Sequence, residues 1–288
     1  MSAIERLTLR GMNIDLAADV AGPVDGPPIL FLHGGGQTRQ SWGKAVIQAS
    51  DRGFRAIALD LRGHGDSGWS PDGRYDLAVF ADDLRCVLAQ LERPPVLVGA
   101  SLGGIMGMVV AAADPAAIRA LVLVDISATI DMDGANEVIA FMNAGSEGFG
   151  SIEAAADAVS AYLPHRDKPR DSRGLAKNLR RRDGRWYWHW DPAFMSMVMD
   201  PKQQADGPTM LETAARGLTI PTLLIRGGRS RIVTEEGARA FLAMVPHADY
   251  VPIDGAHHMV AGEANDAFND AVFAFADRQV EGSAQAGG

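Results

Sequence analysis

Apolar and polar positions follow two different periods over the first 125 residues of the chain. Short runs that are apolar throughout, as expected of strands covered on both faces, are separated by segments with the spacing of an amphipathic helix. Strand-like segments lie at residues 4–10, 13–18, 28–32, 54–60, 95–100 and 120–125, and helical patterns lie at 76–92 and 101–113. The first two segments are expected to form a hairpin. The whole pattern predicts an α/β fold with a mostly parallel, twisted sheet and helices on both faces.

The alternation stops after Asp125 and resumes near residue 216. Between these points, residues 129–215 show helix-like patterns interrupted by Pro and Gly, and no convincing strand. The sheet pattern then returns, with strands at 221–226 and 248–253 and helices at 235–244 and 264–278. We predict a core of residues 1–128 and 216–280, an inserted helical lid of residues 129–215, and a flexible tail of residues 281–288.

Composition narrows the classes of function. The 288 residues are 47% hydrophobic, which allows a sizeable core, and a formal net charge of -9 argues against general affinity for nucleic acid or an anionic membrane. A lone cysteine, Cys86, cannot form an internal disulfide, and the N-terminus has no signal-peptide pattern. Phosphate-loop, dinucleotide-binding and metal-ligand spacings are absent. We expect a cytoplasmic monomer or homodimer that acts on a small molecule without a cofactor.

One segment has the pattern of a nucleophile. Residues 99–103, Gly-Ala-Ser-Leu-Gly, stand where a predicted strand ends and a predicted helix begins. A serine on such a sharp turn is held with its hydroxyl clear of the backbone, and the flanking glycines let strand and helix approach closely. A helix N-cap would also suit a serine, but it does not account for the glycines on both sides. We predict that Ser101 is a catalytic nucleophile.

The order of three motifs resembles that of the α/β-hydrolase family, over nearly the whole chain outside the predicted lid. The motifs are His33-Gly34-Gly35-Gly36, residues 60–67 (DLRGHGDS) and residues 99–104 (GASLGG). The resemblance implies that Gly35 and Leu102 donate backbone N–H groups to an oxyanion, and two such donors stabilise a developing alkoxide. It implies a structural role for His33.

The resemblance also places a catalytic histidine after the last strand, where His257 and His258 are adjacent. In similar proteins this histidine commonly stands five residues before a glutamate. His258 with Glu263 keeps that spacing, and His257 does not. We therefore predict His258 as the base, with His257 as the alternative.

The acid is the point at which the chain departs from the family pattern. Relatives generally carry aspartate where this chain has Arg231, and a buried cation there would oppose the charge that a catalytic imidazole gains. Some members of the fold take the acid from the end of the strand that follows the nucleophile helix, where this chain has Asp125. We predict Asp125 as the acid and Asp254 as the second choice.

The predicted lid contains an aromatic run and a basic run. Trp186, Trp188 and Trp190, with Gly34, are candidates for the substrate pocket, and the alternative is that the tryptophans form the core of the lid. The aromatic and methionine content favours a substrate with an apolar acyl or aromatic part. The basic residues between 166 and 185 are typical of a solvated face, and the alternative is an arginine that meets a carboxylate-bearing substrate.

These residues together predict a serine hydrolase that cleaves a carboxylic ester, lactone or thioester of a small, partly apolar substrate through an acyl-enzyme on Ser101. The same machinery also serves carbon–carbon bonds beside a ketone. Two alternatives stay open. One is a cofactor-free dioxygenase, in which a His–Asp pair deprotonates an aromatic substrate that reacts with oxygen. The other is a ligand-binding protein of this fold with slow or no hydrolysis.

Overall fold

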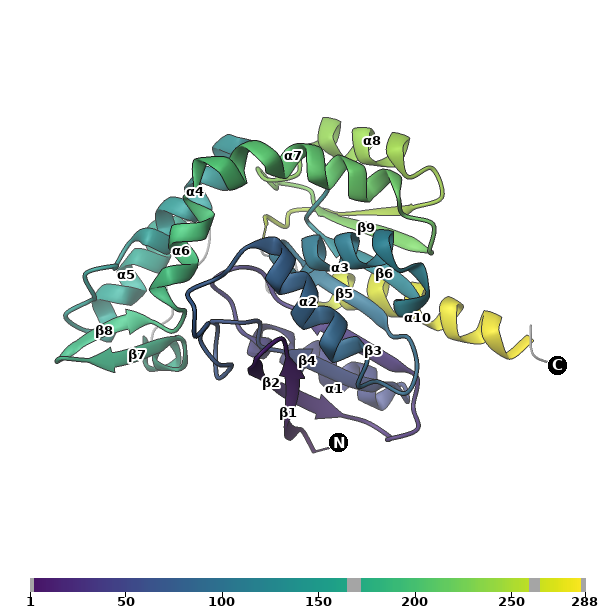
Figure 1. Ribbon diagram of the computed structural model, residues 1–288, viewed down its shortest axis with the longest axis horizontal. Coiled ribbons are helices and arrows are strands. Elements are labelled where there is room, and N and C mark those ends of the chain that lie inside the picture. The colour runs from purple at the N-terminus through teal and green to yellow at the C-terminus, as the bar shows by residue number, and fades with distance from the viewer. Residues whose placement is uncertain (1–2, 165–171, 259–264, 286–288) are drawn as a thin grey trace.

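The computed structural model describes residues 3–164, 172–258 and 265–285, which fold around an eight-stranded sheet (Figure 1). The strand order is β1-β2-β4-β3-β5-β6-β9-β10, in which β1–β2 and β2–β4 pair antiparallel and the other neighbours are parallel. The strands are β1 (Glu5–Gly11), β2 (Ile14–Ala21), β3 (Pro28–Leu32), β4 (Arg55–Leu59), β5 (Val96–Ala100), β6 (Ala120–Val124), β9 (Thr222–Gly227) and β10 (Asp249–Ile253). The predicted fold class is confirmed, and each strand lies within a few residues of its predicted place.

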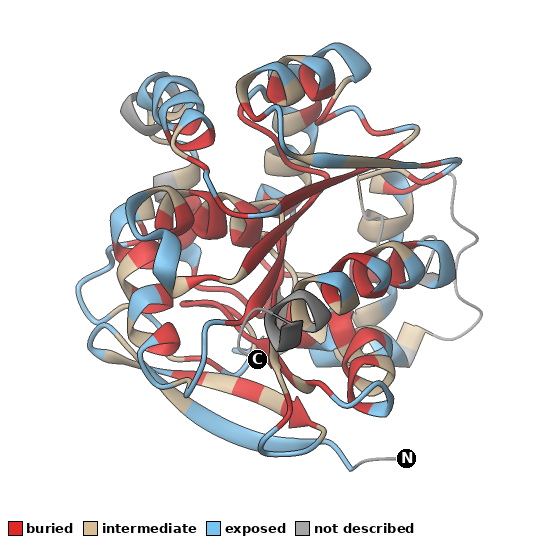
Figure 2. Cartoon of the chain, turned by 90° about the vertical axis from the view of Figure 1, so that its right-hand side faces the viewer, coloured by how far each residue is buried: buried red, intermediate tan, exposed pale blue. Residues whose placement is uncertain are grey.

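Helices cover both faces of the sheet, which is why its strands are apolar throughout. Along β3, Leu30 and Leu32 belong to one buried cluster, and Ile29 and Phe31 belong to the other. Figure 2 shows the strands buried between helical layers. The core helices are α1 (Gly43–Asp51), α2 (Leu77–Leu88), α3 (Leu102–Ala113), α8 (Glu235–Met244) and α10 (Asn265–Gln285). Helices α1 and α10 contribute to the Phe31 cluster, and α2, α3 and α8 contribute to the Leu30 cluster.

Residues 129–215, between β6 and β9, form an insertion at one side of the core (Figure 1). Its described α-helices and strands are α4 (Met132–Asn143), α5 (Ile152–Tyr162), β7 (Leu179–Arg182), β8 (Arg185–Trp188), α6 (Pro192–Val198) and α7 (Pro201–Arg216). Helix α7 leads back to the core and packs against α3.

The hairpin β7–β8 corrects the prediction that this segment holds no strand. Its turn is Asp183-Gly184, and both residues have positive φ angles, of 49° and 79°. Such a turn matches the right-handed twist of an antiparallel pair. The arginines of β7 hide the pattern, because its residues lack the usual apolar alternation.

The C-terminal helix is longer than predicted. Helix α10 extends to residue 285, whereas the sequence predicted a helix end at 278 and a flexible tail from 281. Residues 286–288 lie outside the described part of the chain. Among the described helices, none combines the length and the apolar character that a membrane crossing requires.

Candidate active site

Ser101 lies on a tight turn between β5 and α3. Its φ of 46° and ψ of -116° fall outside the regions that residues with a side chain prefer. A Cβ atom on Gly99 would lie 2.5 Å from the carbonyl oxygen of Gly103, and a Cβ on Gly103 would lie 2.6 Å from the Cβ of Leu32. The glycines that flank Ser101 in sequence are therefore required by the close approach of helix and strand.

Asp125 is fully buried immediately after β6, which is the neighbour of β5 in the sheet. Its Oδ2 accepts a hydrogen bond from His258 Nδ1 at 2.7 Å, and its Oδ1 accepts one from the backbone N–H of Gly227 at 2.8 Å. The hydroxyl of Ser230 donates to Oδ2 as well. These bonds fix the carboxylate, and they keep the proton of a neutral His258 on Nδ1, so that Nε2 carries the free lone pair.

The candidate histidines and acids differ in position. The histidine that contacts Asp125 is His258, and Glu263, on which the spacing argument rested, lies outside the described residues. Asp254 is exposed on the loop after β10. The side chain of Arg231 is 66% exposed and forms an ion pair with Glu137 of α4 at 2.6 Å. Arg231 therefore points away from the histidine. The sequence suggested a buried cation beside the histidine, and this expectation is wrong, because Arg231 is a surface residue.

Ser230 was missed by sequence reasoning. Its hydroxyl oxygen accepts hydrogen bonds from the backbone N–H groups of Ile232 and Val233, at 3.1 and 3.3 Å, while its proton goes to Asp125. Ser230 thus ties the loop after β9 to the carboxylate. Its position one residue before Arg231, in the segment where an acid was sought, was the signal that could have identified it.

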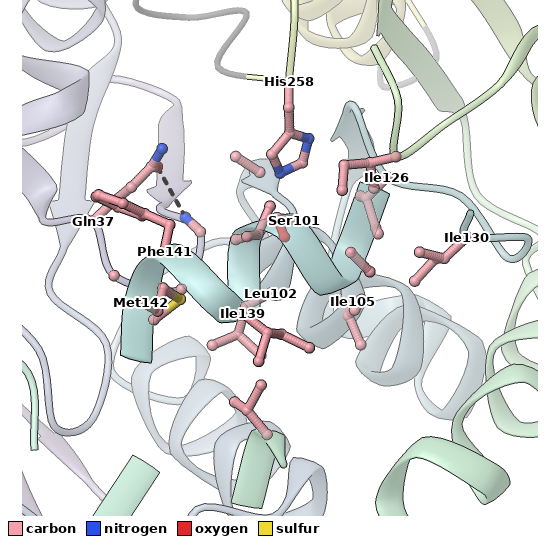
Figure 3. A pocket seen from close by; sticks show the side chains of 18 of the residues that line it. Gln37, Ser101, Leu102, Ile105, Ile126, Ile130, Ile139, Phe141, Met142 and His258 are labelled. Atoms are coloured by element: carbon pink, nitrogen blue, oxygen red, sulfur yellow. Dashed lines mark hydrogen bonds between the residues drawn. The ribbon is translucent and has the colours of Figure 1, made fainter. Parts of the chain in front are cut away.

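Ser101 and His258 both line one cavity of about 640 Å³ between the sheet and the insertion. In Figure 3 the imidazole of His258 points toward Ser101, and apolar side chains surround the pair. The cavity has the size of a small-molecule site. Three of the four pocket candidates, Gly34, Trp188 and Trp190, are part of its wall.

Trp186 does not line this cavity, so its candidacy is corrected. It lies near the turn of the hairpin, directly after Arg185, the first residue of β8. The guanidinium of Arg181 lies 5.8 Å from its ring centroid. Trp188 is nearer the base of the hairpin and stacks on Trp190, with ring centroids 5.2 Å apart. Only the base of the hairpin reaches the cavity.

The glycine loop after β3 is held by hydrogen bonds to the peptide groups of Gly34 and Gly36. Gln37 Oε1 accepts from the Gly34 N–H at 3.2 Å, and His64 Nε2 accepts from the Gly36 N–H at 3.1 Å. Within the described residues, the N–H groups of Gly35 and Leu102 donate to no acceptor of the chain. These two are the donors that the sequence assigned to the oxyanion.

Three buried histidines support this loop, and each uses one ring nitrogen as acceptor and the other as donor. His33 accepts from Leu61 N–H at 3.0 Å and donates to the Gly34 carbonyl at 2.7 Å. His64 donates to the Arg62 carbonyl at 2.8 Å. His189, from the insertion, accepts from Gly65 N–H at 2.8 Å and donates to the Gly36 carbonyl at 3.3 Å. Each ring must be neutral to keep both bonds.

Burial lowers the pKa of these histidines. It brings the pKa of His33 to about 4 and that of His64 to about 3, and it also lowers the pKa of His189. The positive charge of Arg39 acts in the same direction on His33, and a protonated His33 would act in the same direction on His64. Within the described part of the chain, no group of three His, Cys, Asp or Glu side chains has the arrangement of a metal site. The histidines serve the loop as neutral hydrogen-bonding groups.

Further bonds attach the insertion to the core beside this loop. The hydroxyl of Tyr75 donates to Asp191 Oδ2 at 2.7 Å, and the Asp191 N–H donates to the Gly63 carbonyl at 2.8 Å. Arg180 of β7 donates to the Gly65 carbonyl at 2.6 Å and pairs with Asp66 at 3.3 Å. The insertion is thus docked on the segment that the sequence singled out at residues 60–67.

Known proteins resemble this chain over most of its length. A sequence model of the alpha/beta hydrolase fold matches residues 27–264. An esterase of Mycobacterium tuberculosis is 34% identical over 221 residues, which are 73% of this chain and 69% of the esterase. A 2-(acetamidomethylene)succinate hydrolase of Mesorhizobium japonicum is 32% identical over 241 residues, 82% of each chain. A solved structure of an E-2-(acetamidomethylene)succinate hydrolase has a TM-score of 0.83 at 27% identity, over 96% of this chain and all of that one.

Proposed function

The chain belongs to the alpha/beta hydrolase fold family, and from this premise we propose that it hydrolyses a carboxylic ester of a small, partly apolar substrate through an acyl-enzyme on Ser101. Relatives named as an esterase and a hydrolase support hydrolase activity in general. The observation that carries the finer proposal is the 2.7 Å bond between His258 Nδ1 and Asp125, with His258 and Ser101 on the wall of one cavity.

In the acylation step, Ser101 Oγ attacks the ester carbonyl carbon while His258 Nε2 takes the hydroxyl proton. Asp125 keeps the ring oriented through Nδ1 and stabilises the imidazolium that forms. The carbonyl oxygen becomes an oxyanion and accepts hydrogen bonds from the N–H groups of Gly35 and Leu102. The C–O bond to the alcohol then breaks, and Nε2–H returns the proton to the leaving alkoxide.

Deacylation repeats these steps with water as the nucleophile. His258 Nε2 takes a proton from water, the hydroxide attacks the acyl carbon, and the same two N–H groups hold the second oxyanion. Collapse of this intermediate breaks the bond to Ser101 Oγ, which recovers its proton from His258. The products are the carboxylic acid and the free enzyme.

The position of Leu102 supports its part in this scheme. It is the first residue of α3, and the N-terminus of a helix carries unpaired N–H groups and a partial positive charge that favour an anion. Gly35 is the loop residue whose N–H is not engaged by Gln37 or His64. We propose that the insertion acts as a lid over these groups, because its Phe194 and Met142 would lie 3.5 and 3.8 Å from a Cβ atom on Gly35.

Treatment of the purified protein with a fluorophosphonate, followed by intact mass and peptide mapping, tests the proposal. We expect rapid formation of a single adduct on Ser101 and none in Ser101→Ala, together with loss of esterase activity by at least about four orders of magnitude. The Ala variant should keep the wild-type unfolding midpoint within a few degrees. Full esterase activity in Ser101→Ala would end the assignment. Absence of the adduct, with oxygen uptake on an aromatic substrate, would replace it by the dioxygenase.

A further inference from the structure

The distribution of charged and apolar side chains on the cavity wall indicates the class of substrate. We infer that the site selects esters whose acyl group is uncharged and apolar, and that it rejects acyl groups that carry a carboxylate. This inference rests on the proposed ester hydrolysis and names its substrate class. It decides between the apolar and the anionic substrates that the sequence left open.

The wall of the cavity is apolar on each side of the reacting groups. Helix α4 presents Met132, Ala135, Ile139 and Met142, at the three- and four-residue spacing of one helix face. Ile105 of α3 faces them from the core (Figure 3). An acyl chain bound here exchanges contact with water for contact with hydrocarbon. This exchange strengthens binding by roughly fourfold per methylene group.

Among the described residues that line the cavity, none is lysine or arginine, and the one carboxylate is the exposed Glu212 of α7. The neutral polar groups, such as Thr129 and Asn178, can accept or donate hydrogen bonds but cannot balance a charge. Against the described part of the cavity wall, a carboxylate would lose its hydration without gaining a lysine or arginine partner, and burial of an unpaired charge is strongly unfavourable. The negative charge of Glu212 adds to this barrier.

The arginines that the sequence offered as partners for a carboxylate are engaged elsewhere. Arg180 bonds the Gly65 carbonyl and Asp66, and Arg185 donates to the carbonyls of Glu147 and Gly148. The guanidinium of Arg182 lies 4.5 Å from the ring centroid of Tyr187. Arg166, Lys168 and Arg170 lie outside the described residues. Arg180, Arg182 and Arg185 therefore serve the hairpin and its attachment.

The rim of the cavity, where it meets the surface, is also apolar. Met132 of α4 and Met210 of α7 both line the cavity, and they are 43% and 38% exposed. Exposed methionines offer an adaptable apolar surface, because the side chain is unbranched and polarisable. An acyl chain can thus pass from Ser101 to solvent along an apolar path. The Mesorhizobium japonicum relative is named as a hydrolase of a succinate, which is a dicarboxylate. We assign this chain a different class of substrate.

Matched p-nitrophenyl esters test the inference. The acetate, butanoate and octanoate form a length series, and the mono-p-nitrophenyl ester of octanedioic acid adds a terminal carboxylate to the longest chain. Its methyl ester caps that carboxylate at nearly the same size. We expect kcat/KM to rise by roughly fourfold per methylene along the series, to fall by at least about 100-fold for the carboxylate, and to recover for the capped ester.

A pair of variants tests the cause. Ala135→Arg places a cation in the wall of the cavity, and Ala135→Gln places a neutral polar group there. The arginine should narrow the gap between the carboxylate and its methyl ester by at least about tenfold, and the glutamine should leave the gap unchanged. Hydrolysis of the p-nitrophenyl acetate by both variants shows that they are folded and active.

The outcomes separate this inference from the proposed function. Equal rates for the carboxylate and the capped ester, or a flat length series in an enzyme that forms the Ser101 adduct and hydrolyses the acetate, overturn the inference alone. Loss of both the adduct and all ester hydrolysis overturns the proposed function, and the inference falls with it.

Discussion

Asp125 has a positive φ of 49° at the end of β6, a conformation that costs free energy in a residue with a side chain. This strained backbone conformation places the buried carboxylate against His258. Asp125→Asn should lower kcat by roughly 10³- to 10⁴-fold, because an NH2 group replaces one of two oxygens that both accept hydrogen bonds, and the neutral amide cannot stabilise the imidazolium as a carboxylate does. Steady-state kinetics on an activated ester measure the loss.

Asp254→Asn is the matched control, since Asp254 is the other carboxylate near the histidine loop and is exposed. It should retain the wild-type kcat within about twofold. A large loss in Asp254→Asn with little loss in Asp125→Asn would move the acid to the loop.

Ser230 and Arg231 are adjacent, but only Ser230 is expected to matter for stability and catalysis. Ser230→Ala removes a donor to Asp125 and an acceptor for two backbone N–H groups, so it should lower the free energy of unfolding by about 1–3 kcal/mol and kcat by about tenfold. Arg231→Ala removes an exposed ion pair with Glu137, which is worth about 0–1 kcal/mol. Urea unfolding and kcat in both variants compare them, and a more damaging Arg231→Ala would show that the cation acts on the site.

At the scale of elements, the connection between β8 and α6 reaches the glycine loop through His189. The two nitrogens of this ring can be tested separately, because Gln places an N–H near the position of Nε2 and Asn places an oxygen near that of Nδ1. His189→Gln keeps a donor for the Gly36 carbonyl, and His189→Asn keeps only the acceptor for Gly65. We expect His189→Asn to lower kcat by about tenfold with little change in KM, and His189→Gln to retain most of kcat.

Comparing the changes in kcat and in KM distinguishes two roles for His189. It either positions the glycine loop or supports the fold of the insertion. Loosening of the loop weakens only the oxyanion bonds, which form in the transition state. A general loosening of the insertion would raise KM and leave the two variants alike. That result would assign His189 to the stability of the insertion.

The elements differ in how far the sequence could specify them. Strands such as β3 were predictable because burial on both faces demands unbroken apolar runs, and the turn at Ser101 was predictable because its glycines answer a local steric requirement. The hairpin β7–β8 was missed because its side chains are mostly charged or aromatic, and an Asp-Gly turn was the one local signal.

The acid depended on distant parts of the chain. The sequence offered both Asp125 and Asp254 as the acid, and the packing of β6, β9 and β10 brings Asp125, 133 residues away, against the ring of His258. The same holds for Ser230 and His189, whose partners are 105 and 153 residues away. Local periodicity carries no information about such contacts.

At the scale of the whole molecule, the neutral histidines under the glycine loop couple folding to pH. In the unfolded chain a histidine binds a proton below about pH 6.5, whereas folded His33 does so only near pH 4 and folded His64 near pH 3. Between pH 6.5 and 4 the unfolded state therefore holds more protons, and the free energy of unfolding must fall as the pH falls. Each histidine contributes up to about 1.4 kcal/mol per pH unit to this slope.

Urea unfolding at half-unit steps from pH 7 to 4.5 measures this slope, and His64→Gln should reduce it by about one histidine's share. His247→Gln is the matched control, because that histidine is exposed. The slope distinguishes protonation from lost packing, since a packing defect lowers stability equally at all pH values. An unchanged slope in His64→Gln would mean that His64 takes up its proton over the same pH range in the folded and the unfolded chain. Below that range the Gly36 N–H would then lack its acceptor on His64.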